Sequence, residues 1–200
     1  AEVLLLAACG INRTALARDP DQPIDAQSAD AFFSFLKRRC RAEPIAYILG
    51  HKEFWSLDIE LNDATLVPRP ETEILVEMTL DAIPRGTAIE LADLGTGSGA
   101  IALALAIERP LARITATDIS RAALTKAREN AKRLGLDIHF VEGDWYAPLN
   151  GHQFDVIVSN PPYVRREDPA LETGPVRFEP ALALFAGDDG LDCIRTLCAG

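Results

Sequence analysis

The residues best suited to chemistry form the tetrapeptide Asn160-Pro161-Pro162-Tyr163, which follows the apolar run 154–159. Two prolines fix two φ angles and remove two N–H donors, so the Asn160 side chain and the Pro161 carbonyl can accept hydrogen bonds at one point. Such paired acceptors suit a planar NH2 group and make its weakly nucleophilic nitrogen more electron-rich. Tyr163 could stack on this group and aim it at an electrophilic methyl. A proline-rich turn with a packed tyrosine is the alternative.

A glycine-rich segment, Asp93 to Gly99, follows another apolar run and precedes a helical pattern. Gly95, Gly97 and Gly99 permit a tight turn that brings backbone N–H groups against a ligand. The spacing is GxGxG, which differs from the GxGxxG of dinucleotide-binding folds, and no Gly-Lys-Ser/Thr of a P-loop follows. The segment therefore predicts a cofactor loop of another kind, with a glycine turn that binds nothing as the alternative.

Carboxylates end the next two predicted strands. Asp118 ends one strand, and Asp144 follows the other and precedes Trp145. The first acid can accept both hydroxyls of a ribose, and the second acid with its aromatic neighbour can hold an adenine. Taken singly, Asp118 could be a helix N-cap, a role for which Ser120 competes, and Asp144 a turn residue. Because ligands of open α/β sheets bind outside the carboxyl ends of strands, the three strand ends together predict an adenosine site.

Residues from 71 onward alternate between helical and strand patterns, which indicates right-handed βαβ units on a parallel sheet. Gly135 stands where a helix C-cap glycine belongs. The predicted elements are helices 71–83, 99–108, 120–134 and 188–199 and strands 89–94, 113–118, 137–142 and 154–159. This scaffold would bring the candidate residues to one edge of the sheet.

The first 50 residues differ from the rest because their pattern is helical throughout. Ser28 is a plausible N-cap, and Pro44 and Gly50 bracket a last short helix. Residues 53–67 then alternate, which predicts a β-hairpin with its turn at Asn62-Asp63. We expect a small all-helical domain of residues 1–50, a β-hairpin linker of residues 51–70 and an α/β domain of residues 71–200.

The composition excludes several classes of protein. With 200 residues, 48% hydrophobic and 25% charged, and no run of about 20 apolar residues, the chain is expected to be soluble and globular, with no membrane contact. A net charge of −10 disfavours stable binding to nucleic acid, which needs clustered Lys and Arg. The four cysteines lack the spacing of a disulfide framework or a metal site, so we expect reduced thiols, no metal and a cytoplasmic location. They are Cys9, Cys40, Cys193 and Cys198.

These motifs resemble the class I S-adenosylmethionine-dependent methyltransferases, and the tetrapeptide at 160–163 is similar to that of members that methylate planar amino or amide nitrogens. Within this group the chain resembles the peptide chain release factor glutamine N5-methyltransferases. The similarity includes the helical N-terminal module, Arg69 to Glu73, the glycine loop and Phe178-Glu179-Pro180, the last expected to give structural support. It implies a doubly wound Rossmann-like methyltransferase sheet.

The resemblance also implies an activity: methyl transfer from S-adenosylmethionine, with S-adenosylhomocysteine as product, to the glutamine side-chain amide in the Gly-Gly-Gln loop of class I release factors, which modulates translation termination. Asn160, Pro161 and Tyr163 would be catalytic. The cofactor would contact Asp93, Gly95, Thr96, Gly97, Gly99, Asp118, Ile119, Asp144, Trp145 and Asn160. The substrate would contact Arg69, Pro70, Glu71, Thr72, Asn160, Pro161, Pro162 and Tyr163.

Three alternatives qualify this picture. Residues 69–73 could simply be a proline turn and a helix N-terminus whose acids suit the helix dipole. The same tetrapeptide chemistry suits an exocyclic amine of a nucleobase in RNA or DNA, and Arg38, Arg39 and Arg41 form a basic cluster, although a nucleic-acid enzyme would usually have a broader basic face. The third is a non-catalytic S-adenosylmethionine-binding adaptor.

Family members continue past residue 200 with strands that complete the sheet, so we expect a truncated domain with an exposed edge.

Overall fold

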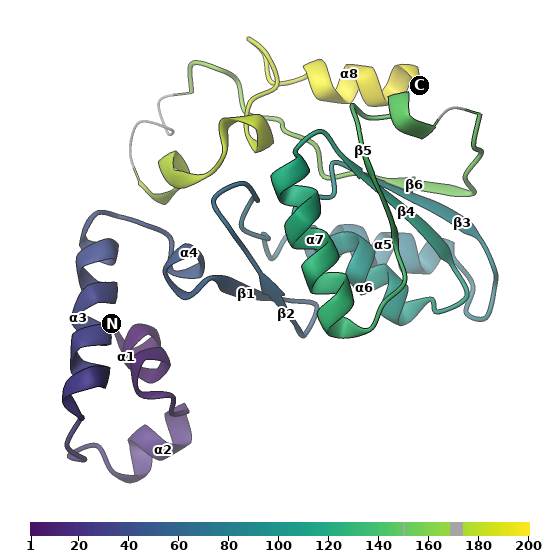
Figure 1. Cartoon of the computed structure of the whole chain (residues 1–200). Coiled ribbons are helices and arrows are strands. Elements are labelled where there is room, and N and C mark those ends of the chain that lie inside the picture. Colours follow the sequence, from purple (N-terminus) through teal and green to yellow (C-terminus); the bar gives the residue numbers. More distant parts are fainter. Residues whose placement is uncertain (150, 169–173) are drawn as a thin grey trace.

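The computed structural model describes residues 1–149, 151–168 and 174–200. A helical module at the N-terminal end is joined through a β-hairpin to an α/β unit (Figure 1). The module contains α1 (Glu2–Cys9), α2 (Arg13–Arg18), α3 (Ala26–Cys40) and α4 (Ile45–Leu49). The expectation of a helical N-terminal region agrees with these elements.

Helix α3 begins three residues earlier than expected. Asp25 is its N-cap, and its carboxylate accepts hydrogen bonds from the backbone N (2.9 Å) and the hydroxyl (2.6 Å) of Ser28. Ser28 therefore donates to the cap instead of forming it, and the sequence prediction at this position was wrong. An Asp and a Ser three residues apart are both good N-cap types, so local propensity did not distinguish them.

The hairpin consists of β1 (His51–Phe54) and β2 (Leu57–Glu60), which pair antiparallel. Its turn is formed by Trp55 and Ser56, with φ angles of +53° and +59°, and the prediction of a turn at Asn62-Asp63 was wrong. Asn62 instead makes a local turn after β2, where its Oδ1 accepts from the backbone N of Ala64 at 3.1 Å. Asparagine favours both kinds of turn, so its presence did not identify which one closes the hairpin.

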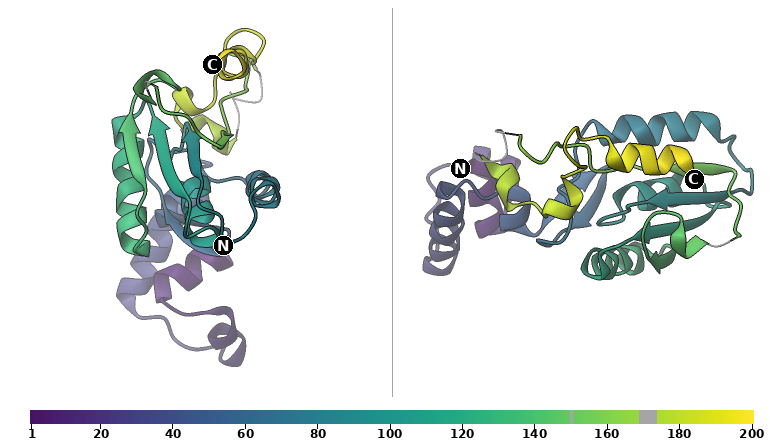
Figure 2. Two further views of the ribbon diagram at one scale, coloured as in Figure 1. Left: turned by 90° about the vertical axis from the view of Figure 1, so that its right-hand side faces the viewer. Right: turned by 90° about the horizontal axis from the view of Figure 1, so that it is seen from above.

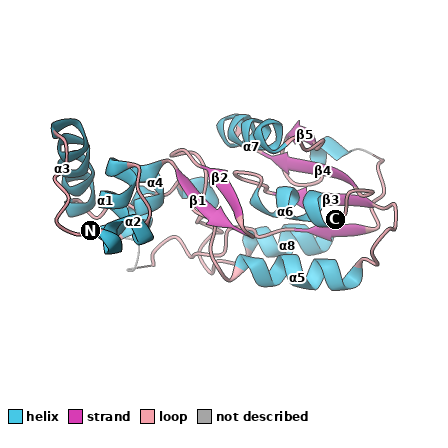
Figure 3. Ribbon diagram, turned by 90° about the horizontal axis from the view of Figure 1, so that it is seen from below, coloured by secondary structure: helices cyan, strands magenta, loops and turns pink. Residues whose placement is uncertain are grey.

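The α/β unit is built on a parallel sheet in the order β5-β4-β3-β6. Its strands are β3 (Glu90–Leu94), β4 (Arg113–Asp118), β5 (His139–Glu142) and β6 (Val156–Val158). Helices α5 (Thr72–Ala82), α6 (Ala100–Glu108) and α7 (Arg121–Leu134) lie on one face and α8 (Asp192–Ala199) on the other (Figures 1 to 3). Helices on both faces confirm the predicted doubly wound α/β fold.

Alternating side chains of β3 reach both layers of the core. Leu91 belongs to the main cluster, which also contains Leu103 and Leu105 of α6, whereas Ala92 and Leu94 pack against a smaller cluster on the opposite face. This second cluster has Leu149 as its other buried member and is flanked by partly buried residues. Strand β3 is thus central, and its carboxyl end carries the glycine loop.

The hairpin is tied to the α/β unit by Asn130 of α7, whose side chain is completely buried. Its Oδ1 accepts from the backbone N of Glu60 at 3.0 Å, and its Nδ2 donates to the carbonyl oxygens of Glu60 (2.9 Å) and Ser98 (3.1 Å). One amide therefore holds the end of β2 and the glycine loop together. The expected C-cap at Gly135, with a φ of +69°, is confirmed at the other end of α7.

Candidate active site

The glycine loop leaves the carboxyl end of β3 in a tight left-handed turn. Gly95, Gly97 and Gly99 have φ angles of +74°, +58° and +86°, which side chains rarely adopt. The backbone N atoms of Gly95 and Thr96 both donate to the carbonyl of Thr117 at 2.9 Å. A Cβ at position 99 would lie 3.2 Å from that of Ala127, so glycine is also required there for close packing on α7.

Asp93 lies behind this loop and is completely buried. Its Oδ2 accepts from the Thr96 hydroxyl at 2.6 Å, while Oδ1 has no hydrogen-bond partner among the described residues. Burial, opposed by the Thr96 hydrogen bond, raises the pKa of Asp93 to about 7. A buried acceptor without a partner costs free energy, so this site favours a donor or a positive charge nearby.

Asp118 stands at the carboxyl end of β4, opposite the loop. One carboxylate oxygen accepts from the backbone N of Gly97 and the other from the backbone N of Ser120, both at 2.8 Å. Burial raises its pKa, and these two hydrogen bonds lower it. Ser120 caps α7 by accepting from the backbone N of Ala123 at 3.2 Å, so the N-cap role belongs to Ser120 and not to Asp118.

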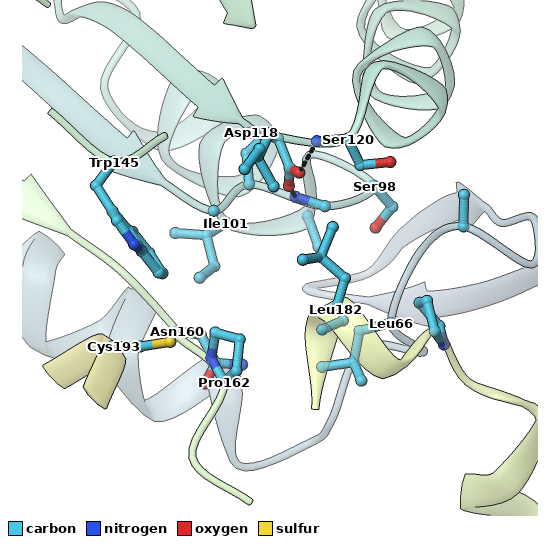
Figure 4. A pocket seen from close by; sticks show the side chains of 18 of the residues that line it. Leu66, Ser98, Ile101, Asp118, Ser120, Trp145, Asn160, Pro162, Leu182 and Cys193 are labelled. Atoms are coloured by element: carbon cyan, nitrogen blue, oxygen red, sulfur yellow. Dashed lines mark hydrogen bonds between the residues drawn. The ribbon is translucent and has the colours of Figure 1, made fainter. Parts of the chain in front are cut away.

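A cavity of about 310 Å³ opens in front of the loop. Figure 4 shows Asp118 on one side of it, with Asn160 and Pro162 across from it and Trp145 on a neighbouring wall. The predicted cofactor residues that line it are Gly95, Thr96, Gly97, Asp118, Ile119, Asp144, Trp145 and Asn160. Asp93 and Gly99 do not line it: Asp93 is buried behind the glycine loop, and Gly99 packs against α7. Its described lining contains two carboxylates and no Lys, Arg or His.

The tetrapeptide lies between this cavity and a second one of about 210 Å³. Asn160 lines both, whereas Pro162 lines only the first and Pro161 and Tyr163 only the second. The hydroxyl of Ser159 donates to the carbonyl of Leu94 at 2.7 Å and fixes the chain just before the motif. The structure thus places the Asn160 amide where contents of the two cavities would meet.

The segment 69–72, which leads into α5, contributes unequally. Arg69 lines the second cavity and Thr72 the first, whereas Pro70 and Glu71 are exposed and line neither. The guanidinium of Arg69 donates to Glu179 at 2.6 Å, and the other oxygen of Glu179 accepts from the backbone N of Val67 at 3.2 Å. The Glu179 side chain is only 1% exposed, so this ion pair holds Arg69 in place on the wall of the second cavity.

Sequence reasoning missed a set of residues that close the two cavities. Several of them lie in the segment 182–186, which pairs with the chain just after the tetrapeptide. The backbone N of Val164 donates to the carbonyl of Leu184 at 2.8 Å, and the carbonyl of Val164 accepts from the backbone N of Ala186 at 2.9 Å. These residues are small or apolar and have no local signal for binding; only the nearby Phe178-Glu179-Pro180 indicated the region. The missed lining residues include Leu66, Pro68, Leu182, Ala183, Phe185 and Cys193.

The basic cluster of the N-terminal module has mostly internal contacts. Arg38 donates from Nε to Glu43 at 2.9 Å and from its terminal nitrogens to the carbonyls of Tyr47 and Ile48 at the end of α4. Arg39 donates to the carbonyl of Glu43 at 3.0 Å. Arg38 is therefore a structural residue rather than part of a free basic surface.

Three further features concern the described ranges: disulfides, metal sites and membrane-spanning helices. All four cysteines are free, and the described side chains include no group of three His, Cys, Asp or Glu placed to hold a metal ion. Within the same ranges, no helix has the length and apolar character needed to cross a membrane.

Comparison with known proteins gives two family matches. The family model of the methyltransferase small domain matches residues 70–179, and that of the PrmC N-terminal domain matches residues 1–50. The chain is 50% identical to a release factor glutamine methyltransferase of Xylella fastidiosa (strain 9a5c) and 47% identical to one of Burkholderia pseudomallei (strain K96243). Both alignments cover 100% of this chain and 73% of the relative. A solved ribosomal protein L11 methylase from Lactobacillus delbrueckii subsp. bulgaricus is 32% identical over 46% of each chain, with a TM-score of 0.39.

Proposed function

The chain belongs to the release factor glutamine methyltransferase family, and on this premise we propose that it methylates N5 of the glutamine side chain in the Gly-Gly-Gln loop of class I release factors. The observation that carries the proposal is the position of Asn160 on the wall common to the two cavities. The first cavity would take the methyl donor and the second the substrate side chain.

The first cavity suits S-adenosylmethionine, which carries a sulfonium and an ammonium group. Asp118 and Asp144 line it, and none of its described lining residues is cationic, so its charge favours a cation and disfavours the phosphates of a dinucleotide. The partnerless Oδ1 of Asp93 leaves a buried acceptor behind the loop, which favours a donor or a cation nearby. When bound, S-adenosylmethionine supplies an electrophilic methyl group. We propose that Asp118, with Ile119 beside it, binds the ribose, Asp144 or Trp145 flanks adenine, and the glycine loop lies along the methionine part.

The second cavity suits the side chain of glutamine. Apolar residues, among them Val164, Val176 and Leu184, would surround the methylene groups, and Asn160 and Pro161 would meet the terminal amide. Tyr163 is 61% exposed and free to lie over the flat amide. Arg69, held by Glu179, would shape the entrance.

The chemistry follows from these contacts. An amide nitrogen is a weak nucleophile because its lone pair is delocalised. When the Asn160 side-chain oxygen and the Pro161 carbonyl accept its two hydrogens, they favour a more pyramidal nitrogen aimed at the first cavity. The methylated nitrogen then loses a proton readily, so the site needs no strong general base.

The domain roles and the partner are part of the same proposal. Residues 1–50 would recognise the release factor, residues 51–70 would link, and residues 71–200 would carry catalysis. The substrate is a translation factor, so a cytoplasmic location follows. Since Arg38 is engaged within the chain and the net charge is −10, we expect no stable nucleic-acid binding.

The decisive experiment is transfer of labelled methyl from S-adenosylmethionine to four acceptors offered in parallel: a class I release factor, the same factor with its loop glutamine changed, ribosomal RNA and duplex DNA. Label should enter only the unchanged release factor. Label in RNA or DNA would instead favour the nucleobase alternative, and cofactor binding without label anywhere would favour the adaptor.

Asn160→Ala tests the centre of the proposal. The variant should bind S-adenosylhomocysteine with little change but lose at least about a hundred-fold in kcat, because the lost interaction is made at the reacting nitrogen. Calorimetric titration gives the affinity and the label assay gives the turnover. A variant with wild-type turnover would refute the assigned role of Asn160.

A further inference from the structure

The side-chain amide of Asn160 has two ends of opposite hydrogen-bonding character, since Oδ1 accepts and Nδ2 donates. The proposed reaction needs Oδ1 to face the NH2 group of the substrate. If the Asn160 amide were flipped, its Nδ2 donor would face the NH2 group of the substrate, which is also a donor. Productive binding therefore requires an acceptor for Nδ2 on the side away from the substrate.

Thr72 supplies such an acceptor. The Nδ2 atom of Asn160 donates to Oγ1 of Thr72 at 3.2 Å, a contact between residues 88 positions apart in the sequence. Thr72 is the first residue of α5 and lines the first cavity, while Asn160 lines both cavities. The hydroxyl is thus placed beside the reacting region and is not part of the distant core.

Both partners of this hydrogen bond are fixed by separate elements. The backbone N of Thr72 donates to the carbonyl of Arg69 at 3.0 Å, and the next residue, Glu73, accepts from the backbone N of Trp55 in the hairpin turn at 2.8 Å. On the other side, the Ser159 hydroxyl holds the end of β6 to β3. The Thr72–Asn160 contact therefore joins two positions that have little freedom to drift.

We propose that Thr72 is a positioning residue: its hydroxyl accepts Nδ2 of Asn160 and thereby turns Oδ1 toward the amide of the substrate. The inference rests on the proposed function, in which Asn160 holds that amide. A threonine hydroxyl can donate as well as accept. The bound substrate needs Oδ1 for its own hydrogen, so the arrangement in which the hydroxyl accepts is the one that satisfies both ends of Asn160.

Two substitutions separate the hydroxyl from the rest of the side chain. Thr72→Val keeps the shape and removes the hydroxyl, whereas Thr72→Ser keeps the hydroxyl and removes the methyl. Thr72→Val should lower kcat about ten- to a hundred-fold and leave the affinity for S-adenosylhomocysteine within about two-fold, because an unsatisfied polar group at the reacting centre affects the transition state. Thr72→Ser should keep kcat within about three-fold of wild type.

The readouts are kcat and KM for the release factor, the affinity for S-adenosylhomocysteine, and the unfolding midpoint. Equal losses in the valine and serine variants, an undiminished kcat in Thr72→Val, or a loss confined to cofactor affinity would each overturn the inference. If Thr72→Val does not fold, Thr72→Ala removes the same hydroxyl from this partly buried position. If the wild-type protein labels RNA or DNA instead, the proposed function fails, and the same variants compared on that acceptor still decide the role of Thr72.

Discussion

The Asp93 carboxyl has an altered acidity because the fold encloses it completely. Its pKa is raised from an ordinary 3.8 to about 7, and burial is the main cause. In the unfolded chain it loses its proton near pH 4, whereas the folded protein keeps the proton until about pH 7. Its contribution to the free energy of unfolding is therefore fully present below about pH 4 and is lost as the pH rises toward 7.

Asp93→Asn should remove this dependence. Relative to the variant, the wild-type protein without cofactor should lose about 2 kcal/mol in its free energy of unfolding between about pH 5.5 and pH 7, since one pKa unit corresponds to about 1.4 kcal/mol. Urea unfolding of both proteins at several pH values in this window gives the difference. A difference that does not change with pH would show that Asp93 ionises normally in the folded protein.

Individual residues of the site could be predicted from sequence where the signal was local. Asp118 and Asp144 were recognised because Asp118 ends β4 and Asp144 lies two residues after β5, and strand ends converge at one edge of a parallel sheet. The Thr72–Asn160 hydrogen bond could not be predicted, because its partners lie 88 residues apart and neither residue type specifies the other. Leu182 and Phe185 were missed for the same reason: an apolar residue that closes a cavity looks like any core residue.

Among the secondary-structure elements, the hairpin depends on α7 through the buried amide of Asn130. Asn130→Ala would leave the backbone N and carbonyl of Glu60 and the carbonyl of Ser98 without these partners. We expect a loss of about 2–4 kcal/mol in the free energy of unfolding and a weaker affinity for S-adenosylhomocysteine, since Ser98 belongs to the glycine loop. Denaturant unfolding and calorimetric titration measure the two effects.

The matched control is Lys132→Ala, which changes an exposed residue on the same helix and should shift neither quantity measurably. If Asn130→Ala is destabilised but binds the cofactor product with wild-type affinity, the amide supports the hairpin without positioning the loop. Wild-type stability would contradict the argument as a whole.

The elements themselves were largely predictable because their periods and caps are strong. Strand β4 and helix α7 lie within a residue of the expected ranges, and Gly135 and Ser120 mark the ends of α7. The hairpin was different. Trp55 and Ser56 adopt positive φ angles that neither residue type favours, so the tertiary contacts of the hairpin, including the bond from Trp55 to Glu73, override local preference.

Across the whole molecule, a series of contacts links the helical module to the substrate cavity. Arg177 donates to the carbonyl of Arg41 at the end of α3 at 2.5 Å, and two residues later Glu179 holds Arg69 at the second cavity. Tyr47 of α4 makes a second link, because its hydroxyl donates to the carbonyl of Thr65 at 2.6 Å. The module that is proposed to recognise the release factor is thereby oriented relative to Asn160.

Arg177→Ala should loosen this orientation without touching the cofactor cavity, since Arg177 lines neither cavity. We expect KM for the release factor to rise by up to about ten-fold, because the module loses one of the contacts that orient it, while kcat and the affinity for S-adenosylhomocysteine stay near wild type. Arg85→Ala, at an exposed position between α5 and β3, is the charge-matched control and should leave KM unchanged. If both variants raise KM equally, the effect is one of net charge; if Arg177→Ala alone raises it, the contact with Arg41 sets the angle at which the module presents the release factor to the amide site.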